Sequence, residues 1–303
     1  MPLPTPPLAR AALLCVIACA FFASANALGK AAQSIVPGPD LHPLQVTAAR
    51  FLFALIALLP FIAQRGLGTY RTAIPFRHLQ RALLGVAGVT CIFTAVHAMP
   101  LADATAIVWA APLFTLVFAA WFLREHVGIV RWLAAGIGFA GVAVLMQPTG
   151  AAFEPAALIA LAAALFTGAE VATIRILARR DATLTVLAIN NTLGAVIALL
   201  AASFVFVTPS WPQAATLAGV GVVMVTGQAI LLKSLAIAEA SAMAPFYYAT
   251  IVWSAVIGVV VFDEILTWRL FLGAALIALG GIAVAFKRRP ALHRADAAID
   301  QKL

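Results

Sequence analysis

Several ionisable and polar side chains of this sequence lie inside long apolar stretches, where each needs a specific reason to be present. Glu170 lies in the stretch 155–175, about 22 Å along a helix that begins at Pro155. A charged side chain at the centre of a membrane-spanning helix costs about 2.5–3.5 kcal/mol if it is unpaired. The functional interpretation is a cavity carboxylate that binds a substrate amine or a proton. The structural alternative is an ion pair with Arg175 or a hydrogen bond that locks the helices together.

Asn26 occupies, in the first apolar stretch, the place that Glu170 occupies in the sixth. Residues 22–26 read FASAN and residues 166–170 read FTGAE. We therefore predict that Asn26 and Glu170 face the same cavity. A hydrogen bond between neighbouring helices is the alternative role for Asn26.

A polar stripe follows the third apolar stretch. Thr90, Thr94 and His97 recur at helical spacing and share one face of a helix. His97 is a candidate substrate or proton ligand, although a histidine in such a stripe also occurs as a satisfied packing residue. Gln228 is a further cavity candidate, whereas Lys233 is expected to extend toward lipid phosphate.

Three aromatic residues lie away from the expected membrane interfaces. Trp and Tyr normally collect in interfacial belts, but Trp109, Tyr247 and Tyr248 lie deep in apolar stretches. Such rings can line a pocket and bind organic substrates by stacking and cation–π contacts, or they can simply pack helices. Pro112 and Pro245 lie close to them and predict kinks.

No motif for a metal, a cofactor or ATP accompanies these residues. The sequence has no phosphate-binding loop of the GxxxxGK[ST] type and no HExxH pair. The histidines are scattered without metal-ligand spacing: His42, His78, His97, His126 and His293. We therefore expect no cofactor and no catalytic residues. An intramembrane transferase is the remaining enzyme class, but Asp103, Glu170 and Glu239 are spread over both membrane sides.

Composition identifies the surroundings of the chain as lipid. Of its 303 residues 64% are hydrophobic and 10% are charged, whereas a soluble domain has roughly 25% charged residues. The net charge of +8 does not indicate a nucleic-acid partner, because the basic residues lie between apolar stretches rather than on one soluble face. Cys15, Cys19 and Cys91 lie inside apolar stretches, so a disulfide scaffold is not expected.

The apolar stretches predict ten transmembrane helices. Each approaches the ~20 residues needed to cross about 30 Å of hydrocarbon, and helices satisfy their own backbone hydrogen bonds there. The stretches are 11–28, 44–63, 79–98, 101–123, 130–147, 155–175, 185–207, 213–232, 240–262 and 268–286. The first also has features of a cleavable signal peptide, with small residues at Ala23–Ala27. We take it as a helix because the repeat needs it.

The chain consists of two copies of one unit. At a constant offset, Thr90 aligns with Thr226, His97 with Lys233 and Asp103 with Glu239. Further downstream, Gly141-Val-Ala-Val aligns with Gly281-Ile-Ala-Val. Because each copy has five helices, an odd number, the two copies cross the membrane in opposite directions. Inverted repeats of this kind are typical of secondary transporters, whose substrate site lies near the midplane between the repeats.

The basic residues predict that both termini are cytoplasmic. With the N-terminus inside, only Lys30, Arg50 and Arg269 of the 19 basic residues fall on the outer side. The other 16 are Arg10, Arg65, Arg71, Arg77, Arg81, Arg124, Arg131, Arg175, Arg179, Arg180, Lys233, Lys287, Arg288, Arg289, Arg294 and Lys302.

Together these features resemble the EamA family of the drug/metabolite transporter superfamily, over roughly residues 10–287. The resemblance depends on the ten helices in two copies, His42-Pro43 followed by Arg50-Phe51-Leu52, and the alanine-rich starts of helices four and nine. The Arg124-Glu125 and Asp263-Glu264 pairs and the glycine-rich helices five and ten add to it. In the second copy Asn190–Asn191 lie where the first has Arg50, so that arginine is not duplicated. The resemblance implies a central cavity inside helices one to four and six to nine, with helices five and ten peripheral. Family members export amino acids, drugs, nucleosides and other metabolites, and relatives of the family carry sugar phosphates or nucleotide sugars.

The sequence therefore predicts an all-α integral membrane protein with two inverted five-helix repeats around a central cavity. Residues 1–9 and 287–303 are expected to be cytoplasmic tails, and 10–147 and 155–286 the two repeats. The function expected is secondary transport of small organic metabolites, most of all export of neutral or aromatic amino acids across the bacterial inner membrane, with proton coupling as one driving force. Amphipathic drugs or nucleosides are the alternative substrates, and an intramembrane transferase is the remote alternative. The predicted substrate-binding residues are Asn26, Thr90, His97, Trp109, Glu170, Gln228, Tyr247 and Tyr248.

Overall fold

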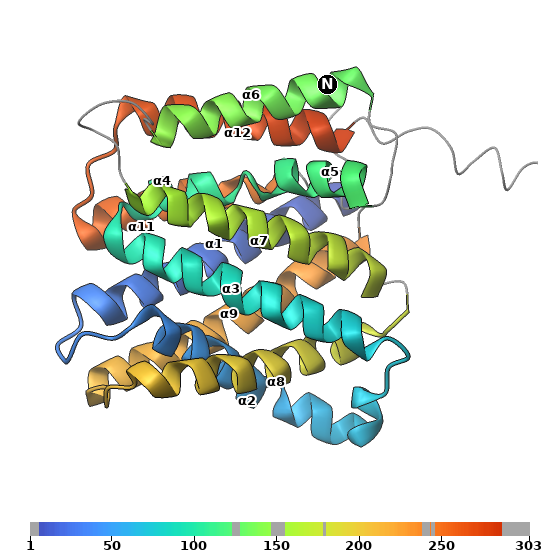
Figure 1. Ribbon diagram of the computed structural model, residues 1–303, viewed down its shortest axis with the longest axis vertical. Coiled ribbons are helices and arrows are strands. Elements are labelled where there is room, and N and C mark those ends of the chain that lie inside the picture. Colours follow the sequence, from blue (N-terminus) through green and yellow to red (C-terminus); the bar gives the residue numbers. More distant parts are fainter. Residues whose placement is uncertain are drawn as a thin grey trace, which may run out of the picture.

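The described part of the chain consists of helices joined by short loops (Figure 1). The computed structural model describes residues 6–122, 128–146, 155–177, 180–237, 243 and 246–286, and this part has no strand. The helices of the first half are α1 (Pro6–Ser34), α2 (Pro43–Arg65), α3 (Pro75–Ala98), α4 (Leu101–Val108), α5 (Ala111–Phe122) and α6 (Ile129–Met146). Those of the second half are α7 (Pro155–Leu177), α8 (Thr183–Ala202), α9 (Trp211–Ile237), α11 (Ala249–Phe262) and α12 (Trp268–Phe286).

Six helical segments of the described chain are long and apolar enough to cross a membrane. They are Ala9–Ser34, Pro43–Arg65, Pro75–Ala98, Leu101–Phe118, Thr183–Val205 and Trp211–Leu231. Shorter apolar helices cover Trp132–Met146, Pro155–Val171, Ala249–Phe262 and Trp268–Ala283. The prediction of a helical membrane protein is therefore confirmed, while the number of ten spans stays a prediction.

The first helix packs within the bundle from Ala11 onward. It begins at Pro6, so residues 6–9 of the predicted N-terminal tail are helical. Ala23, Ala25 and Ala27, the small residues that also suit a signal peptidase, are buried, and α1 packs against α9 and α11. These contacts favour a permanent transmembrane helix over a cleaved signal peptide.

The predicted fourth helix is interrupted, which differs from the continuous segment 101–123 expected from the sequence. It divides into α4 and α5 at Trp109 and Ala110. Pro112 follows directly and has no N–H to donate to the carbonyl of Val108, so the regular helical ladder stops. Ala110 instead donates to Ile107 O at 3.0 Å. In the second half Tyr248 lies in a turn directly before α11, whereas Pro245 lies outside the described residues.

Several contacts between the two halves come in equivalent pairs: a contact of a first-half helix with a second-half helix has a counterpart in which the two halves have exchanged roles. Helix α1 packs against α9, and α3 packs against α7. Similarly, α2 packs against α9 and α3 against α8, while α1 packs against α11 and α7 against α5. The pairs α2–α8 and α6–α12 join elements that take the same place in each half, and both pairs lie side by side in Figure 1.

Glycine brings α6 and α12 into close contact at one edge of the bundle (Figure 1). A Cβ atom on Gly141 would lie 2.6 Å from Gly273 O, and one on Gly280 would lie 2.6 Å from Ala134 O. Small residues allow backbones to approach in this way between membrane helices. The glycines noted in the sequence are therefore packing residues.

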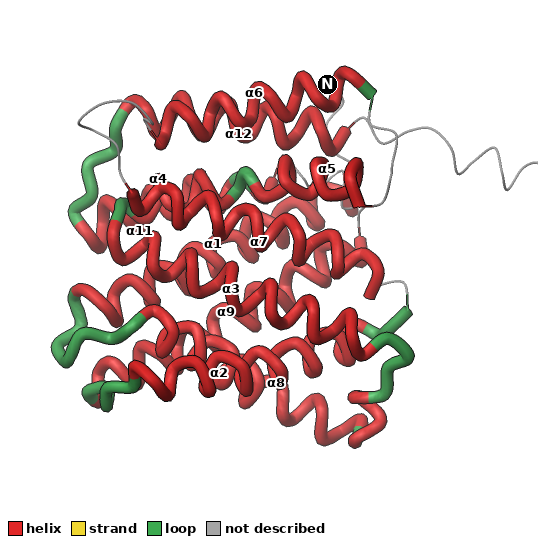
Figure 2. Tube along the Cα trace, viewed as in Figure 1, coloured by secondary structure: helices red, strands yellow, loops and turns green. Residues whose placement is uncertain are grey.

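The loops gather at the two ends of the bundle (Figure 2). We call one end the Lys30 end; it holds the connections after α1, α3, α8 and α11. We call the other the His78 end; it holds the connections after α2 and α7.

Candidate functional site

A charged cluster of Arg50, Arg81 and Glu170 lies within helices of the bundle. Arg81 Nε lies 3.4 Å from Glu170 Oε1, and their side chains are 6% and 20% exposed. The two residues come from α3 and α7, which pack against each other. Gly85, one turn after Arg81, lies against the Glu170 carboxylate, since a Cβ atom there would be in van der Waals contact at 3.4 Å from Oε1. Arg175, the partner considered in the sequence analysis, has a side chain outside the described part of the structure.

The two arginines of this cluster are held differently. Arg81 Nη1 donates to Val186 O on α8 at 3.0 Å. The guanidinium of Arg50 on α2 lies over the Phe51 ring, 4.6 Å from its centroid. Arg50 Nε is shielded from solvent and has no hydrogen-bond partner among the described residues. Helix α2 packs against α3, which carries Arg81, and α3 packs against α7, which carries Glu170. Together the three side chains carry two positive charges and one negative charge.

The predicted aromatic residues meet beside the helix interruptions. Trp109 stacks on Tyr247 with ring centroids 5.9 Å apart and lies at a tilt to Tyr248 at 6.0 Å. All three side chains are half-buried. Tyr247 packs toward Cys15 and Cys19 of α1, whereas Tyr248 reaches toward Gly281 of α12. We call these three residues the aromatic cluster. The cluster joins the two halves where α4 ends and α11 begins.

The remaining predicted residues occupy separate places. Asn26 and Gln228 are half-buried on α1 and α9, which pack together. Thr90 Oγ1 donates to Thr47 Oγ1 at 3.1 Å, which links α3 to α2. His97 is exposed in the last turn of α3, at the Lys30 end. Among the described residues no hydrogen bond or ion pair joins these four to the charged cluster, so their roles stay predictions.

Polar contacts tie the two halves of the chain together at both ends of the bundle. At the Lys30 end, Lys30 and Glu264 form an ion pair at 2.5 Å. At the His78 end, Asp181 Oδ2 accepts hydrogen bonds from His78 Nε2 at 2.8 Å and from Thr72 Oγ1 at 2.7 Å. Burial disfavours the Asp181 carboxylate, but these bonds hold its pKa below the ordinary value. Glu239, aligned with Asp103 in the sequence, lies outside the described residues.

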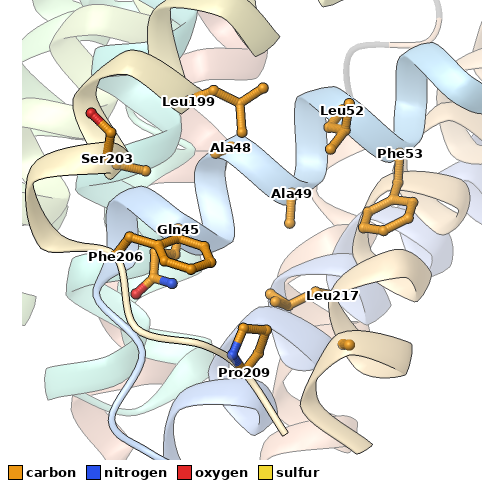
Figure 3. Close-up of a pocket in the computed structure, with 12 residues that line it drawn as sticks. Gln45, Ala48, Ala49, Leu52, Phe53, Leu199, Ser203, Phe206, Pro209 and Leu217 are labelled. Atoms are coloured by element: carbon orange, nitrogen blue, oxygen red, sulfur yellow. The ribbon is translucent and has the colours of Figure 1, made fainter. Parts of the chain in front are cut away.

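A cavity of about 580 Å³ lies elsewhere, between α2, α8 and α9 (Figure 3). Its walls are mostly apolar, with Leu52, Phe53, Phe206 and Leu217 among the largest side chains. The side-chain amide of Gln45 already has a partner, since its Nε2 donates to Val207 O at 2.8 Å. None of the charged or aromatic cluster lines this cavity. Ser203, the other polar residue of the lining, donates from Oγ to Leu200 O at 2.7 Å. Both polar side chains therefore already have backbone partners, the lining carries no charge, and we do not assign the substrate to this cavity.

Within the described residues no group of three or more His, Cys, Asp or Glu could hold a metal ion. The sequence analysis predicted Glu170 and the three aromatic residues as site candidates but named neither Arg50 nor Arg81 as one. Arg81 was considered only as a charge that orients the protein, and Arg50 as an orienting charge and as part of the family resemblance. The available signal was their position inside apolar segments, since an intramembrane charge is by default a functional candidate.

Comparison with known proteins gives consistent results. The model of the EamA-like transporter family matches residues 9–147 and again residues 154–286. An S-adenosylmethionine uptake transporter of Rickettsia felis is 31% identical over 85% of this chain and 87% of that protein. A riboflavin transporter of Rhizobium johnstonii is 32% identical over 74% and 75%. The pseudopaline exporter CntI of Pseudomonas aeruginosa is 26% identical over 90% and 94%. A crystal structure with 24% identity, covering 91% of this chain and 97% of its own, aligns with a TM-score of 0.61 and shows the same fold.

Proposed function

The chain belongs to the EamA-like transporter family, and on this premise we propose that it moves neutral or aromatic amino acids out of the cell across the bacterial inner membrane. The observation that carries the proposal is the charged cluster within helices of the membrane bundle. Glu170 can receive a substrate ammonium group or a proton there. The aromatic cluster at the helix interruptions supplies rings for the substrate side chain. A carboxylate that exchanges a proton with substrate would also couple transport to the proton gradient.

Two features support ten spans in two inverted repeats. The family model matches the chain twice, at residues 9–147 and 154–286, which agrees with predicted repeats at 10–147 and 155–286. The exchanged helix pairs, such as α1–α9 and α3–α7, are what a pseudo-two-fold axis between the halves requires. The four shorter apolar helices complete ten spans if α4 and α5 count as one.

The contacts at the two ends favour alternating access. In such a mechanism the two ends of the bundle open in turn around a fixed site. The Lys30–Glu264 pair and the Asp181 contacts with Thr72 and His78 each join the first half to the second. Each can therefore act as the closed gate at its end. With both termini cytoplasmic, as the basic residues predict, the Lys30 end faces the outside of the cell.

Uptake of S-adenosylmethionine is the second candidate function. Its support is the likeness to transporters with that name, 31% identical in Rickettsia felis and 30% in Rickettsia bellii. The aromatic cluster would then contact the purine, and the charged cluster the amino-acid group of the same molecule. Both candidates place the substrate in one site and differ in its size and in the direction of transport.

Transport by purified protein in lipid vesicles separates these candidates. Vesicles are loaded with L-phenylalanine, L-leucine, S-adenosylmethionine or riboflavin, and exchange of the radiolabelled compound is measured with and without a proton gradient. We expect exchange of the amino acids, fastest for L-phenylalanine. Exchange of S-adenosylmethionine alone would establish the second candidate, and exchange of none of the four would reject both. Product analysis of the same vesicles would reveal an enzymatic reaction.

A further inference from the structure

One positive charge of the charged cluster has no counter-charge in the described protein. The carboxylate of Glu170 lies 3.4 Å from Arg81, and Arg81 also uses the carbonyl of Val186. Arg50 has neither of these partners, and its Nε atom is shielded from solvent without a hydrogen bond among the described residues. The two guanidinium groups and one carboxylate therefore leave a net charge of +1 inside the bundle.

An unpaired guanidinium inside the bundle destabilises the protein unless a further group supplies the missing negative charge or hydrogen-bond acceptor. A guanidinium stays protonated in proteins, so Arg50 cannot relieve the cost by losing its proton. Arg50 as a whole is half-buried, but its Nε–H is shielded from water, and a polar group removed from water without a partner costs free energy. The cost is tolerated where the residue binds a mobile partner during function.

The surroundings of Arg50 limit what that partner can be. The Phe51 ring lies against the guanidinium, with its centroid 4.6 Å away, so the N–H groups at the guanidinium edge remain for a ligand. On α8, Asn190 lies one helical turn after Val186, the residue that binds Arg81. Its Oδ1 atom is also buried without a partner among the described residues. The Nε atoms of Arg50 and Arg81 are therefore unused donors of the charged cluster, and Asn190 Oδ1 on α8 is an unused acceptor.

We propose that Arg50 binds a carboxylate group of the transported molecule, and that the protein therefore selects metabolites with a free carboxylate. The planar fork of a guanidinium matches the two oxygens of a carboxylate. A single carboxylate also pairs one-to-one with the guanidinium that lacks a counter-charge, whereas a phosphate monoester, with about −1.5 to −2 charges, exceeds that one positive charge. This inference rests on the proposed function, since it concerns the same site, and it makes the acid group rather than the side chain the first requirement for binding.

Ligand-induced thermal stabilisation of the purified protein tests this without any transport. The probes are L-phenylalanine and 3-phenylpropionate, which carry a carboxylate, and L-phenylalanine methyl ester and 3-phenylpropan-1-ol, which do not. The variants are Arg50→Gln, Arg50→Lys and, as a matched control, Arg77→Gln. Arg77 is exposed on α3, outside the charged cluster.

The wild type and Arg77→Gln should be stabilised by the two acids and not by the ester or the alcohol. Arg50→Gln should weaken acid binding about tenfold or more, because a charge-assisted bidentate contact is lost. Arg50→Lys should bind the acids weakly. Without ligand, Arg50→Gln should melt no lower than the wild type, since it removes an unpaired charge.

Four results would overturn the inference. In the wild type these are equal stabilisation by acid and ester, and no stabilisation by either acid. In Arg50→Gln they are acid binding as strong as in the wild type, and a strongly lowered melting temperature without ligand, which would indicate a structural ion pair. The vesicle exchange assay tests the proposed function separately. If the protein exchanges amino acids but binds their esters equally well, this inference fails and the proposed function stands.

Discussion

Lys30 Nζ lies 2.5 Å from Glu264 Oε1, so the first helix is tied directly to the loop before the last helix. Both carboxylate oxygens of Glu264 also accept from Leu101 N at 2.9 Å. Lys30 donates in addition to Met99 O at 2.9 Å and lies over the Phe262 ring. The pair therefore satisfies the backbone at the start of α4 as well as its own charges. Opening this end of the bundle has to break these contacts together.

We expect Glu264→Gln to destabilise the protein strongly. The two side chains are only 11% and 8% exposed, and removal of one partner of a buried ion pair costs about 3–5 kcal/mol because the other charge is left unpaired. Thermal unfolding of the purified variant measures this. Asp263→Asn is the matched control, since Asp263 is exposed and should shift the free energy of unfolding by less than about 0.5 kcal/mol. Equal effects of the two variants would show that the Lys30–Glu264 pair contributes little.

Asp181→Asn should weaken the His78 end of the bundle. Its carboxylate accepts from Thr72 and His78, and a hydrogen bond to a charged group contributes about 1.5–3 kcal/mol. Asp40→Asn, at an exposed loop position, is the control. Denaturant or thermal unfolding of both variants gives the comparison. A loss no greater than in the control would mean that these contacts do not hold the two halves together.

The pH dependence of this loss follows from the lowered pKa of Asp181. Burial raises the pKa and the two hydrogen bonds lower it, and the result lies below the ordinary 3.8. A carboxylate with a lower pKa in the folded state contributes its stability above the ordinary value and loses it as the pH falls through the folded value. The difference in the free energy of unfolding between wild type and Asp181→Asn should therefore be constant between about pH 5 and pH 8 and shrink only below about pH 4.

Apolar segments predicted most of the fold because length and hydropathy determine which segments can enter lipid. The helix interruption at Trp109 was harder to predict. Pro112 indicated a bend, but a membrane helix can also absorb a proline when neighbouring groups satisfy the freed carbonyl. The structure adds the position of α7. Gly168 of α7 lies against the backbone of Ala111, directly after the interruption, and this close approach could not be predicted from the sequence.

Two of the three members of the charged cluster escaped prediction for a different reason. A basic residue near the end of an apolar stretch is equally consistent with a cytoplasmic loop and with a buried site. Arg81 was counted among the loop charges, yet it is 5% exposed and bonded to Val186. The two cases differ in whether the basic residue has an acidic partner. The partner of Arg81 is Glu170, which is distant in sequence, so the pair could not be recognised from local spacing. Glu170 itself was found because an acidic residue has no role in orientation.

Cysteine labelling in intact cells should find the two ends of the bundle on opposite sides of the membrane. In a background without Cys15, Cys19 and Cys91, we expect Thr208→Cys to react with a membrane-impermeant maleimide and Ala73→Cys to react only after lysis. Both positions are exposed and lie in the loops after α8 and α2. Strong labelling at position 73 from outside would reverse the proposed orientation.

Trp109→Ala should change the substrate preference more than the stability. Trp109 is half-buried and contacts Tyr247 and Tyr248, so its loss removes a stacking surface worth about 0.5–1.5 kcal/mol beyond the buried area. Competition by a panel of amino acids in the vesicle assay should show the largest loss for aromatic competitors and a small one for L-leucine. Trp109→Phe should restore most of the preference. A uniform loss for all competitors would assign Trp109 to helix packing.

Glu170→Gln gives the most decisive test of the site. The substitution leaves Arg50 and Arg81 without a carboxylate, although a glutamine can still accept one hydrogen bond from Arg81. If Glu170 binds a substrate ammonium or a proton, transport should fall about tenfold or more, as expected for the loss of one charged hydrogen bond. The pH dependence of transport, measured between about pH 5 and pH 8, should also change, because a glutamine can neither bind nor release a proton. Glu170→Asp should retain part of the activity.

A structural role for Glu170 would give a different pattern, and the double variant Arg81→Gln/Glu170→Gln separates the two. If Glu170 serves only to neutralise Arg81, 3.4 Å away, removing both charges relieves the unpaired guanidinium and should restore transport toward the wild-type rate. If Glu170 handles substrate or proton, the double variant should fold at least as well as Glu170→Gln and remain inactive, because the missing group is the carboxylate itself. Normal transport by Glu170→Gln across this pH range would move the site assignment to the polar residues of α3 and α9, namely Thr90, His97 and Gln228.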